Sequence, residues 1–237
     1  RLHLHILGSG SKGNCALIEG PQGLIMVDDG LSRRETLKRM AELELSVDDV
    51  YALVVTHEHS DHIKGLEVWC KHWNGPVFSS RGTLTSKESL AHLPVEEFDP
   101  GDALSIAGVH IQTYSTSHDV VNPVGYRFDA QGDSIGFATD TGELSKHAID
   151  TLKDCRILAL ESNHDVTMLR QGDYPRFLQE RILSVKGHLS NDQAADAARA
   201  LATDRTEQLI AMHISQDNNR PSLTVKSYAS SLDATLD

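Results

Sequence analysis

The chain has 237 residues, of which 39% are hydrophobic and 24% charged, a composition typical of a globular protein that can bury a sizeable core. Its formal net charge of −12 argues against a broad, sequence-independent grip on nucleic acid through a basic surface, although ions bound in a cleft would add positive charge that this count omits. No apolar run approaches the roughly 20 residues that span a bilayer, and three scattered cysteines form no disulfide framework, so we expect a cytoplasmic protein without membrane contacts.

Alternation of apolar and polar residues, with glycine turns between the runs, predicts many short strands and a few helices. Strands are expected at Leu2–Leu7, Cys15–Glu19, Leu24–Val27, Val50–Val55, Val77–Ser79, His110–Tyr114, Gly125–Asp129, Ser134–Ala138, Ile157–Leu160 and Gln208–His213. Helices are expected at Ser32–Glu44, Gly65–Trp73, Asn191–Ala202 and near the C-terminus, with Ser32 as the N-cap of the first. No Pro/Ser-rich linker divides the chain, so we expect a single domain over 1–237, of the α/β class, in which two sheets pack together with helices outside.

The most informative feature is a run of side chains that bind metals, directly after the expected strand at Val50–Val55. Three imidazoles and a carboxylate fall within six positions: His57, His59, Asp61 and His62. Zinc prefers such ligands, and one tetrahedral ion takes four, so these residues could serve two ions. A solvated loop is the alternative, but ordinary packing gives no reason for this density of ligand types.

Three more residues of ligand type, His118, Asp140 and His213, each follow an apolar run that predicts a strand. Taken alone, each histidine is more often a surface or hydrogen-bonded residue, and Asp140 could equally cap a turn. Their shared placement after a strand, in a chain that already has a ligand cluster, favours metal binding.

The order of these motifs resembles that of the metallo-β-lactamase-fold hydrolases over nearly the whole chain, and the HxHxDH element is highly specific for that superfamily. The resemblance implies an αββα sandwich of two mixed β-sheets with outer helices, and metals at one edge between the sheets. It implies one ion on His57, His59 and His118 and a second on Asp61, His62 and His213, with Asp140 bridging them. Asp28 matches the motif whose carboxylate supports the site by hydrogen bonding, although Asp29 stands where many members have a small residue.

Four segments resemble the YycJ/WalJ branch of this superfamily, whose members are regarded as DNA exonucleases and are similar to phosphodiesterases such as tRNase Z. They are 7–15, 161–165, 186–191 and 213–221. The stretch from Gly187 to Ser190 resembles the His-Ser-Thr element of tRNase Z, in which a histidine protonates the leaving oxygen. The resemblance thus implies that His188, supported by Glu161, is a catalytic acid; otherwise His188 simply precedes the helix start at Ser190.

These observations lead to the hypothesis of a metal-dependent phosphodiesterase acting on nucleic acid, with DNA as substrate, in the manner of an exonuclease. Two divalent ions would share a water and lower its pKa, Asp61 would orient that water, and His188 with Glu161 would protonate the leaving oxygen. Imidazole-rich ligation favours Zn²⁺, and the carboxylates would also accept Mn²⁺ or Fe²⁺. Candidate contacts to substrate phosphates are Ser9, Lys12, Asn14 and Arg220.

Other functions fit the same residues. A hydrolase of this fold could act on a cyclic or short phosphodiester, a thioester or a lactone, and a non-catalytic metal-binding regulatory partner is a further alternative. Nothing in the chain resembles the large insert or flexible arm with which many related nucleases hold the polymer.

Overall fold

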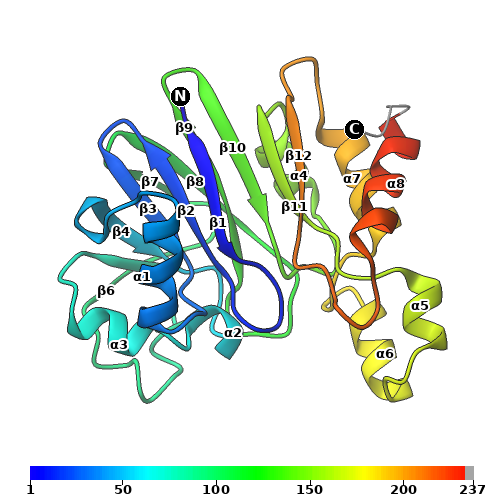
Figure 1. Cartoon of the computed structure of the whole chain (residues 1–237), viewed down its shortest axis with the longest axis horizontal. Coiled ribbons are helices and arrows are strands. Elements are labelled where there is room, and N and C mark those ends of the chain that lie inside the picture. The colour runs from blue at the N-terminus through cyan, green and yellow to red at the C-terminus, as the bar shows by residue number, and fades with distance from the viewer. Residues whose placement is uncertain (233–237) are drawn as a thin grey trace. The chain divides into compact units, whose positions relative to one another are not determined.

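The computed structural model describes residues 1–232, which divide into two compact units (Figure 1). The first unit comprises Arg1–Thr113, Val120–Val124 and Phe128–Asp133. The second comprises Tyr114–Asp119, Gly125–Arg127 and the chain from Ser134 onward. The single domain expected over 1–237 stays a prediction.

The first unit contains a six-stranded mixed sheet. Its strands follow the chain order: β1 (His3–Gly8), β2 (Cys15–Gly20), β3 (Gly23–Val27), β4 (Val50–Val54), β5 (Val77–Ser80) and β6 (Val95–Phe98). The β1–β2 and β2–β3 pairs are antiparallel, whereas β3–β4, β4–β5 and β5–β6 are parallel. The carboxyl ends of β3 and β4 therefore lie at the same edge, which is where Asp28 and the run from His57 begin.

The second sheet also has six strands, in the order β12-β11-β10-β9-β8-β7. Their bounds are β7 (Ala103–Ile106), β8 (Val109–Ser115), β9 (Val124–Ala130), β10 (Asp133–Ala138), β11 (Ile157–Glu161) and β12 (Gln208–Met212). β7 and β8 form an antiparallel pair, whereas β10, β11 and β12 run parallel as neighbours. Parallel neighbours with residues buried on both faces are usually covered by helices, and here helices follow β10 and β11.

The helices of the first unit are α1 (Arg33–Glu42), α2 (Ser60–Ile63) and α3 (Leu66–Lys71), with a 3₁₀ turn at Val47–Asp49. Ser32 is the N-cap of α1, because its hydroxyl accepts a hydrogen bond from the Glu35 amide at 3.2 Å. Met40 of α1 and Trp69 of α3 are buried in one apolar cluster with Leu17 and Leu53 of the sheet. This cluster is the core that holds the first sheet and its helices together.

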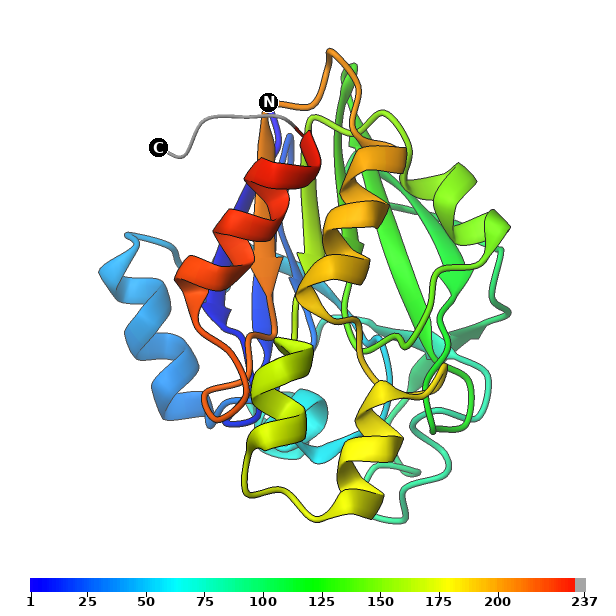
Figure 2. The ribbon, with the colours of Figure 1, turned by 90° about the vertical axis from the view of Figure 1, so that its right-hand side faces the viewer.

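The helices of the second unit are α4 (Lys146–Leu152), α5 (Val166–Gln171), α6 (Arg176–Leu183), α7 (Asn191–Leu201) and α8 (Pro221–Leu232). Ser190 begins α7 with a capping box, in which its hydroxyl accepts from the Gln193 amide and the Gln193 side chain accepts from the Ser190 amide. Figure 2 shows α7 and α8 side by side. Alanines of α7 and Leu158 of β11 share the apolar core of this unit with Leu152 of α4.

The two mixed sheets with outer helices confirm the fold class expected from the sequence. Six strands and α-helices were not expected, β6, β7, α2, α4, α5 and α6, nor was the 3₁₀ turn at Val47–Asp49. They are short, and α6 begins after Pro175 without a side-chain cap, so its start carries no capping signal. No helix within residues 1–232 has the length and apolar character needed to cross a membrane.

Candidate metal centre

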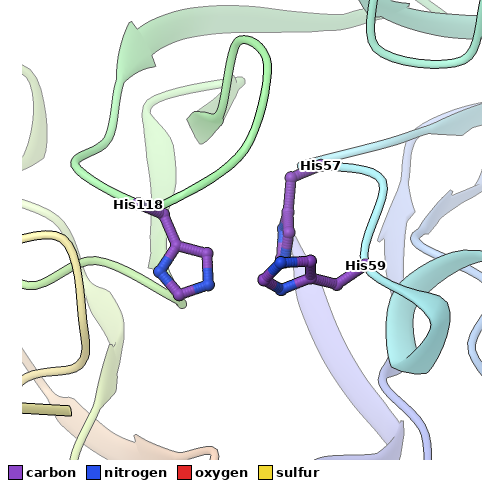
Figure 3. Close-up of side chains that lie close together, drawn as sticks. All are labelled: His57, His59 and His118. Carbon is purple, nitrogen blue, oxygen red and sulfur yellow. The ribbon is translucent and has the colours of Figure 1, made fainter. Parts of the chain in front are cut away.

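The histidine-rich run of the first unit forms the turn between β4 and α2. Its first histidine, His57, is buried, and His59 is half-buried at the start of α2. Their rings lie nearly perpendicular, with centroids 4.9 Å apart (Figure 3). His62 is buried on the next turn, with its ring centroid 4.1 Å from that of His57. The turn therefore gathers three imidazoles into one small volume.

Asp28 determines which nitrogen of two of these histidines can bind a metal. Its carboxylate accepts hydrogen bonds of 2.7 Å from the Thr56 amide and the Thr56 hydroxyl, and lies 2.7 Å from Nδ1 of His62. Because an ionised carboxylate can only accept, Nδ1 of His62 carries the hydrogen, and in the neutral ring Nε2 then presents its lone pair. The Thr56 hydroxyl has donated its hydrogen to Asp28, so at 2.9 Å it accepts from Nδ1 of His57, and the same tautomer follows there.

The two adjacent aspartates thus differ in their surroundings. Neither carboxylate oxygen of Asp29 has a hydrogen-bond partner within the described chain, and the side chain is fully buried. Burial, and then the charge of Asp28, raise the pKa of Asp29 to about 8. Asp28, rather than Asp29, contacts the histidine turn, although its supporting role in catalysis stays a prediction.

Asp61 is held by the glycine-serine loop that follows β1. Nδ2 of Asn14 lies 3.1 Å from the Asp61 carboxylate, and the Asn14 amide donates to the Asp61 carbonyl at 2.7 Å. Gly30 packs against the same place: a β-carbon on it would lie 1.7 Å from the Asp61 carbonyl oxygen. Asn14 is buried, whereas Ser9 and Lys12 of this loop are exposed. The substrate contacts expected of these three residues stay predictions.

In the second unit, three ligand-type residues lie at the carboxyl ends of neighbouring parallel strands. Asp140 follows β10, Glu161 ends β11, and His213 follows β12. Because parallel strands end at one edge of a sheet, residues far apart in sequence come together there. One oxygen or nitrogen of each of these residues, and one of His188, all lie within 4.8 Å of one another.

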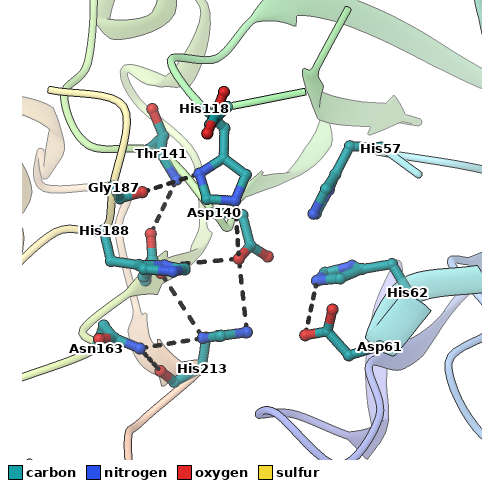
Figure 4. A network of polar contacts seen from close by, with 12 residues as sticks. His57, Asp61, His62, His118, Asp140, Thr141, Asn163, Gly187, His188 and His213 are labelled. Carbon is teal, nitrogen blue, oxygen red and sulfur yellow. Dashed lines mark hydrogen bonds and ion pairs between the residues drawn. The ribbon is translucent and has the colours of Figure 1, made fainter. Parts of the chain in front are cut away.

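The polar contacts of this group centre on two buried carboxylates (Figure 4). Oδ1 of Asp140 lies 3.8 Å from Nε2 of His118, 3.6 Å from Nδ1 of His188 and 3.6 Å from Nε2 of His213. Glu161 is fully buried; it contacts Nδ1 of His188 and accepts from the Thr141 amide at 2.9 Å. His188 is 19% exposed, so its ring joins the buried carboxylate to the surface.

Two further contacts hold ligand-type histidines of this unit. The Gly187 carbonyl lies 3.0 Å from Nδ1 of His118 and can only accept, which directs the Nε2 lone pair of His118 away from it. Burial lowers the pKa of His118, so this ring is neutral near pH 7, the form that binds metals. Nδ2 of the Asn163 side chain lies 3.2 Å from Nδ1 of His213 and donates to the His213 carbonyl at 3.1 Å.

Three of these residues have an unusual backbone. Asp28, Asp140 and His213 have φ angles of 61°, 51° and 54°, the left-handed region that L-residues rarely adopt. Each stands directly or almost directly after a strand, where such a conformation turns the chain sharply. Strained residues of this kind cluster at functional sites because the surrounding structure holds them in place.

Thr56 and Asn163 were given no role in the sequence analysis. Thr56 immediately precedes the histidine run, and Asn163 lies two residues after Glu161, so proximity to candidate residues was the available signal. Arg220, the remaining expected substrate contact, is exposed at the start of α8. The donor set itself, neutral imidazoles with buried carboxylates, fits one or more divalent ions of the zinc type.

Comparison with known proteins places this chain in a family. Residues 24–214 match the model of the β-lactamase superfamily domain. The exodeoxyribonuclease YycJ of Bacillus anthracis is 37% identical over 94% of this chain and 86% of its own length. The exodeoxyribonuclease WalJ of Streptococcus pneumoniae (strain D39) is 34% identical over 90% of this chain and 82% of its own.

A solved structure agrees on the fold. The metallo-β-lactamase-fold protein YhfI of Bacillus subtilis superposes with a TM-score of 0.75 at 15% identity, covering 99% of this chain and 94% of its own. The resemblance predicted from the motifs is confirmed. The chain belongs to the β-lactamase superfamily and, within it, to the family of the YycJ and WalJ exodeoxyribonucleases.

Proposed function

We propose that this protein is a metal-dependent phosphodiesterase that degrades nucleic acid, specifically a DNA exonuclease. Relatives that are 37% and 34% identical over the aligned residues carry the name exodeoxyribonuclease and align over most of the chain. The observation that carries the proposal is the contact between Glu161 and Nδ1 of His188, a nitrogen that lies 3.6 Å from Oδ1 of the ligand-type carboxylate of Asp140. Hydrolysis of a phosphodiester needs a proton on the departing oxygen, and this pair is placed to supply one.

The proposal assigns ligands to two ions. One ion would be held by His57, His59 and His118, and the other by Asp61, His62 and His213, with Asp140 shared between them. The tautomers that Asp28, Thr56 and Gly187 impose suit this assignment, because each leaves Nε2 of its histidine with a lone pair. The ions are divalent, and we expect zinc because imidazoles dominate the set. Bound, they supply Lewis acidity, which lowers the pKa of a water and offsets charge on the phosphate.

The protein's own groups perform the remaining steps. Asp61, held by Asn14, would orient the attacking water. Glu161 fixes the His188 ring by its contact with Nδ1, and in the charged ring, where both nitrogens carry a hydrogen, Nε2–H can donate a proton to the departing sugar oxygen. Ser9, Lys12 and Arg220 are exposed and are our proposed contacts for neighbouring phosphates, with Asn14. Cytoplasmic location stays a prediction.

The test is digestion of end-labelled DNA by zinc-loaded and manganese-loaded protein. Duplex and single-stranded DNA, with either the 5′ or the 3′ end labelled, run beside RNA of the same sequence. The Glu161→Gln variant removes the charge that holds His188, and Glu143→Gln, an exposed carboxylate of the same unit, is the matched control.

Stepwise shortening of DNA by wild type and Glu143→Gln, with a loss of about 10²- to 10⁴-fold in Glu161→Gln, is the expected result. Equal digestion by both variants would remove Glu161 and His188 from the mechanism. If the wild type leaves all polymers intact but hydrolyses bis(p-nitrophenyl) phosphate, the substrate is a small phosphodiester instead.

A further inference from the structure

Helix α6 carries an exposed aromatic side chain that the proposed chemistry does not use. Phe177 is 76% exposed, the most exposed large apolar side chain among residues 1–232. Ile182, on the opposite face of the helix, is buried, so α6 packs on the unit with one face and presents Phe177 on the other. Figure 2 shows α6 in yellow, beside α5 and below α7.

The segment that contains Phe177 has an excess of positive charge, in a chain with a net charge of −12. The segment 166–186 has four cationic side chains, Arg170, Arg176, Arg181 and Lys186, against two acidic ones, Asp173 and Glu180. All four cations are exposed. A local excess of cations on an acidic protein favours an acidic partner.

Arg181 lies one helical turn after Phe177, so the two share the exposed face. Its guanidinium is 3.6 Å from Asp119, but both side chains are more than half exposed, which makes the pair weak and exchangeable. Arg176 is 92% exposed and lies 3.9 Å from Glu180. We call Arg176, Phe177, Arg181 and Lys186 the α6 surface.

The carboxyl end of α6 is hydrogen-bonded to the loop that contains His188 and contacts His118, two residues of the proposed site. The His188 amide donates to the Ile182 carbonyl at 3.0 Å, and the Gly187 amide to that of Ser184 at 3.0 Å. The carbonyl of Gly187 itself accepts a hydrogen bond from Nδ1 of His118. A β-carbon on Gly187 would lie 2.2 Å from the Ile182 carbonyl oxygen, so this junction is tightly packed. Because the carboxyl end of α6 contacts the backbone of His188, a ligand bound along α6 would have one end close to His188.

We propose that the α6 surface binds the single-stranded end of the DNA that is being digested, an inference that rests on the proposed exonuclease function. Phe177 stacks against one base, and Arg181, Arg176 and Lys186 contact the backbone phosphates on either side. Aromatic rings between cations are the means by which proteins hold single strands without sequence preference. The charge of the surface favours nucleic acid over an apolar protein partner.

The first experiment measures binding without turnover. Fluorescence anisotropy follows a labelled single-stranded oligonucleotide with phosphorothioate linkages, titrated with wild type and variants of the metal-loaded protein. Phe177→Ala and Phe177→Leu are expected to weaken binding about 5- to 100-fold, because stacking needs the ring, and Phe177→Trp to restore it. Val225→Ala, an exposed apolar residue of α8, is the control and should bind as the wild type does.

Charge contacts are tested by salt. Arg181→Ala is expected to reduce the slope of log affinity against log salt by about 0.7, the value for one phosphate contact on a single strand. If Phe177→Leu binds the oligonucleotide as tightly as the wild type does, the aromatic ring is not needed for binding and the stacking proposal fails. It also fails if Phe177→Ala binds unchanged, as a surface for a partner protein would predict.

The outcome for the α6 surface can be separated from that for the exonuclease. If the wild type digests no DNA while the Phe177 series still changes binding, the exonuclease proposal is wrong and the binding surface stands. If the wild type digests DNA and the Phe177 variants bind and digest equally well, the surface is wrong and the exonuclease stands.

Discussion

Replacing Asp28 by Asn should weaken metal binding without removing any proposed ligand. The change keeps the volume of a buried side chain but puts an NH₂ group where a carboxylate oxygen stood. Three donors, the Thr56 amide, the Thr56 hydroxyl and Nδ1 of His62, now face one carbonyl oxygen and one amide nitrogen. In either orientation of the amide, at least one donor meets a donor.

The relief available is a change of tautomer. If His62 moves its hydrogen to Nε2, its Nδ1 can accept, but the nitrogen we assign to the metal is then blocked. The Thr56 hydroxyl, released from Asp28, can donate to His57 and block it in the same way. Loss of such supporting partners costs about 10- to 100-fold in metal affinity, which corresponds to about 1.4–2.8 kcal/mol.

The assay is zinc competition against a chromophoric chelator, with Asp29→Asn as the matched control. Asp29 is the next residue, equally buried, and neither of its oxygens has a hydrogen-bond partner within the described chain. We expect Asp28→Asn to lose affinity and Asp29→Asn to retain it. Wild-type affinity in Asp28→Asn would refute the tautomer argument, and equal losses in both variants would show that the effect does not depend on the hydrogen bonds of Asp28.

Three other predictions concern stability. The pKa of Asp29 is raised to about 8 in the folded protein, so between about pH 4 and pH 8 the folded state keeps a proton that the unfolded chain releases. In this range the free energy of unfolding therefore falls by about 1.4 kcal/mol per pH unit because of this group. Asp29→Asn cannot ionise, and its urea midpoint should fall less from pH 5 to pH 8 than that of wild type; parallel profiles would mean that Asp29 does not titrate in this range. Ser190→Ala removes the capping box of α7 and should cost about 1 kcal/mol, a drop in Tm of about 2–4 °C, and an unchanged Tm would show that tertiary packing alone fixes this helix start. Gly30→Ala should lower stability by about 1–3 kcal/mol in urea unfolding, because its β-carbon would lie 1.7 Å from the Asp61 carbonyl oxygen; a wild-type midpoint would mean that the Asp61 turn moves aside freely.

The candidate residues could be found from the sequence because each follows an apolar run that predicts a strand. A strand was expected at Val50–Val55 and forms as β4 over Val50–Val54, and the histidine run begins three residues beyond it at His57. Asp140 and His213 were expected to be ligands because each follows such an apolar run, and the parallel order of β10, β11 and β12 places both at one edge of the sheet. Most of the candidate ligands were therefore predicted from the periodicity of the strands that precede them.

Other features depend on contacts between residues distant in sequence, which periodicity does not report. The choice between Asp28 and Asp29 is decided by hydrogen bonds to Thr56 and His62 and by the backbone angle at Asp28. Helix α6 escaped prediction because eight residues after an uncapped start carry too weak a signal. The role of the Gly187 carbonyl cannot be seen in any sequence motif, since it belongs to the backbone.

The left-handed backbone at Asp28, Asp140 and His213 affects how mutational scans of this protein should be designed. Alanine at these positions would add conformational strain to the loss of the functional group, so the two effects could not be separated in one variant. Asparagine tolerates this conformation better and glycine adopts it freely. A scan that pairs Asn with Gly at each position separates the contribution of the side chain from the cost of the turn, whereas an alanine scan would overstate the importance of all three.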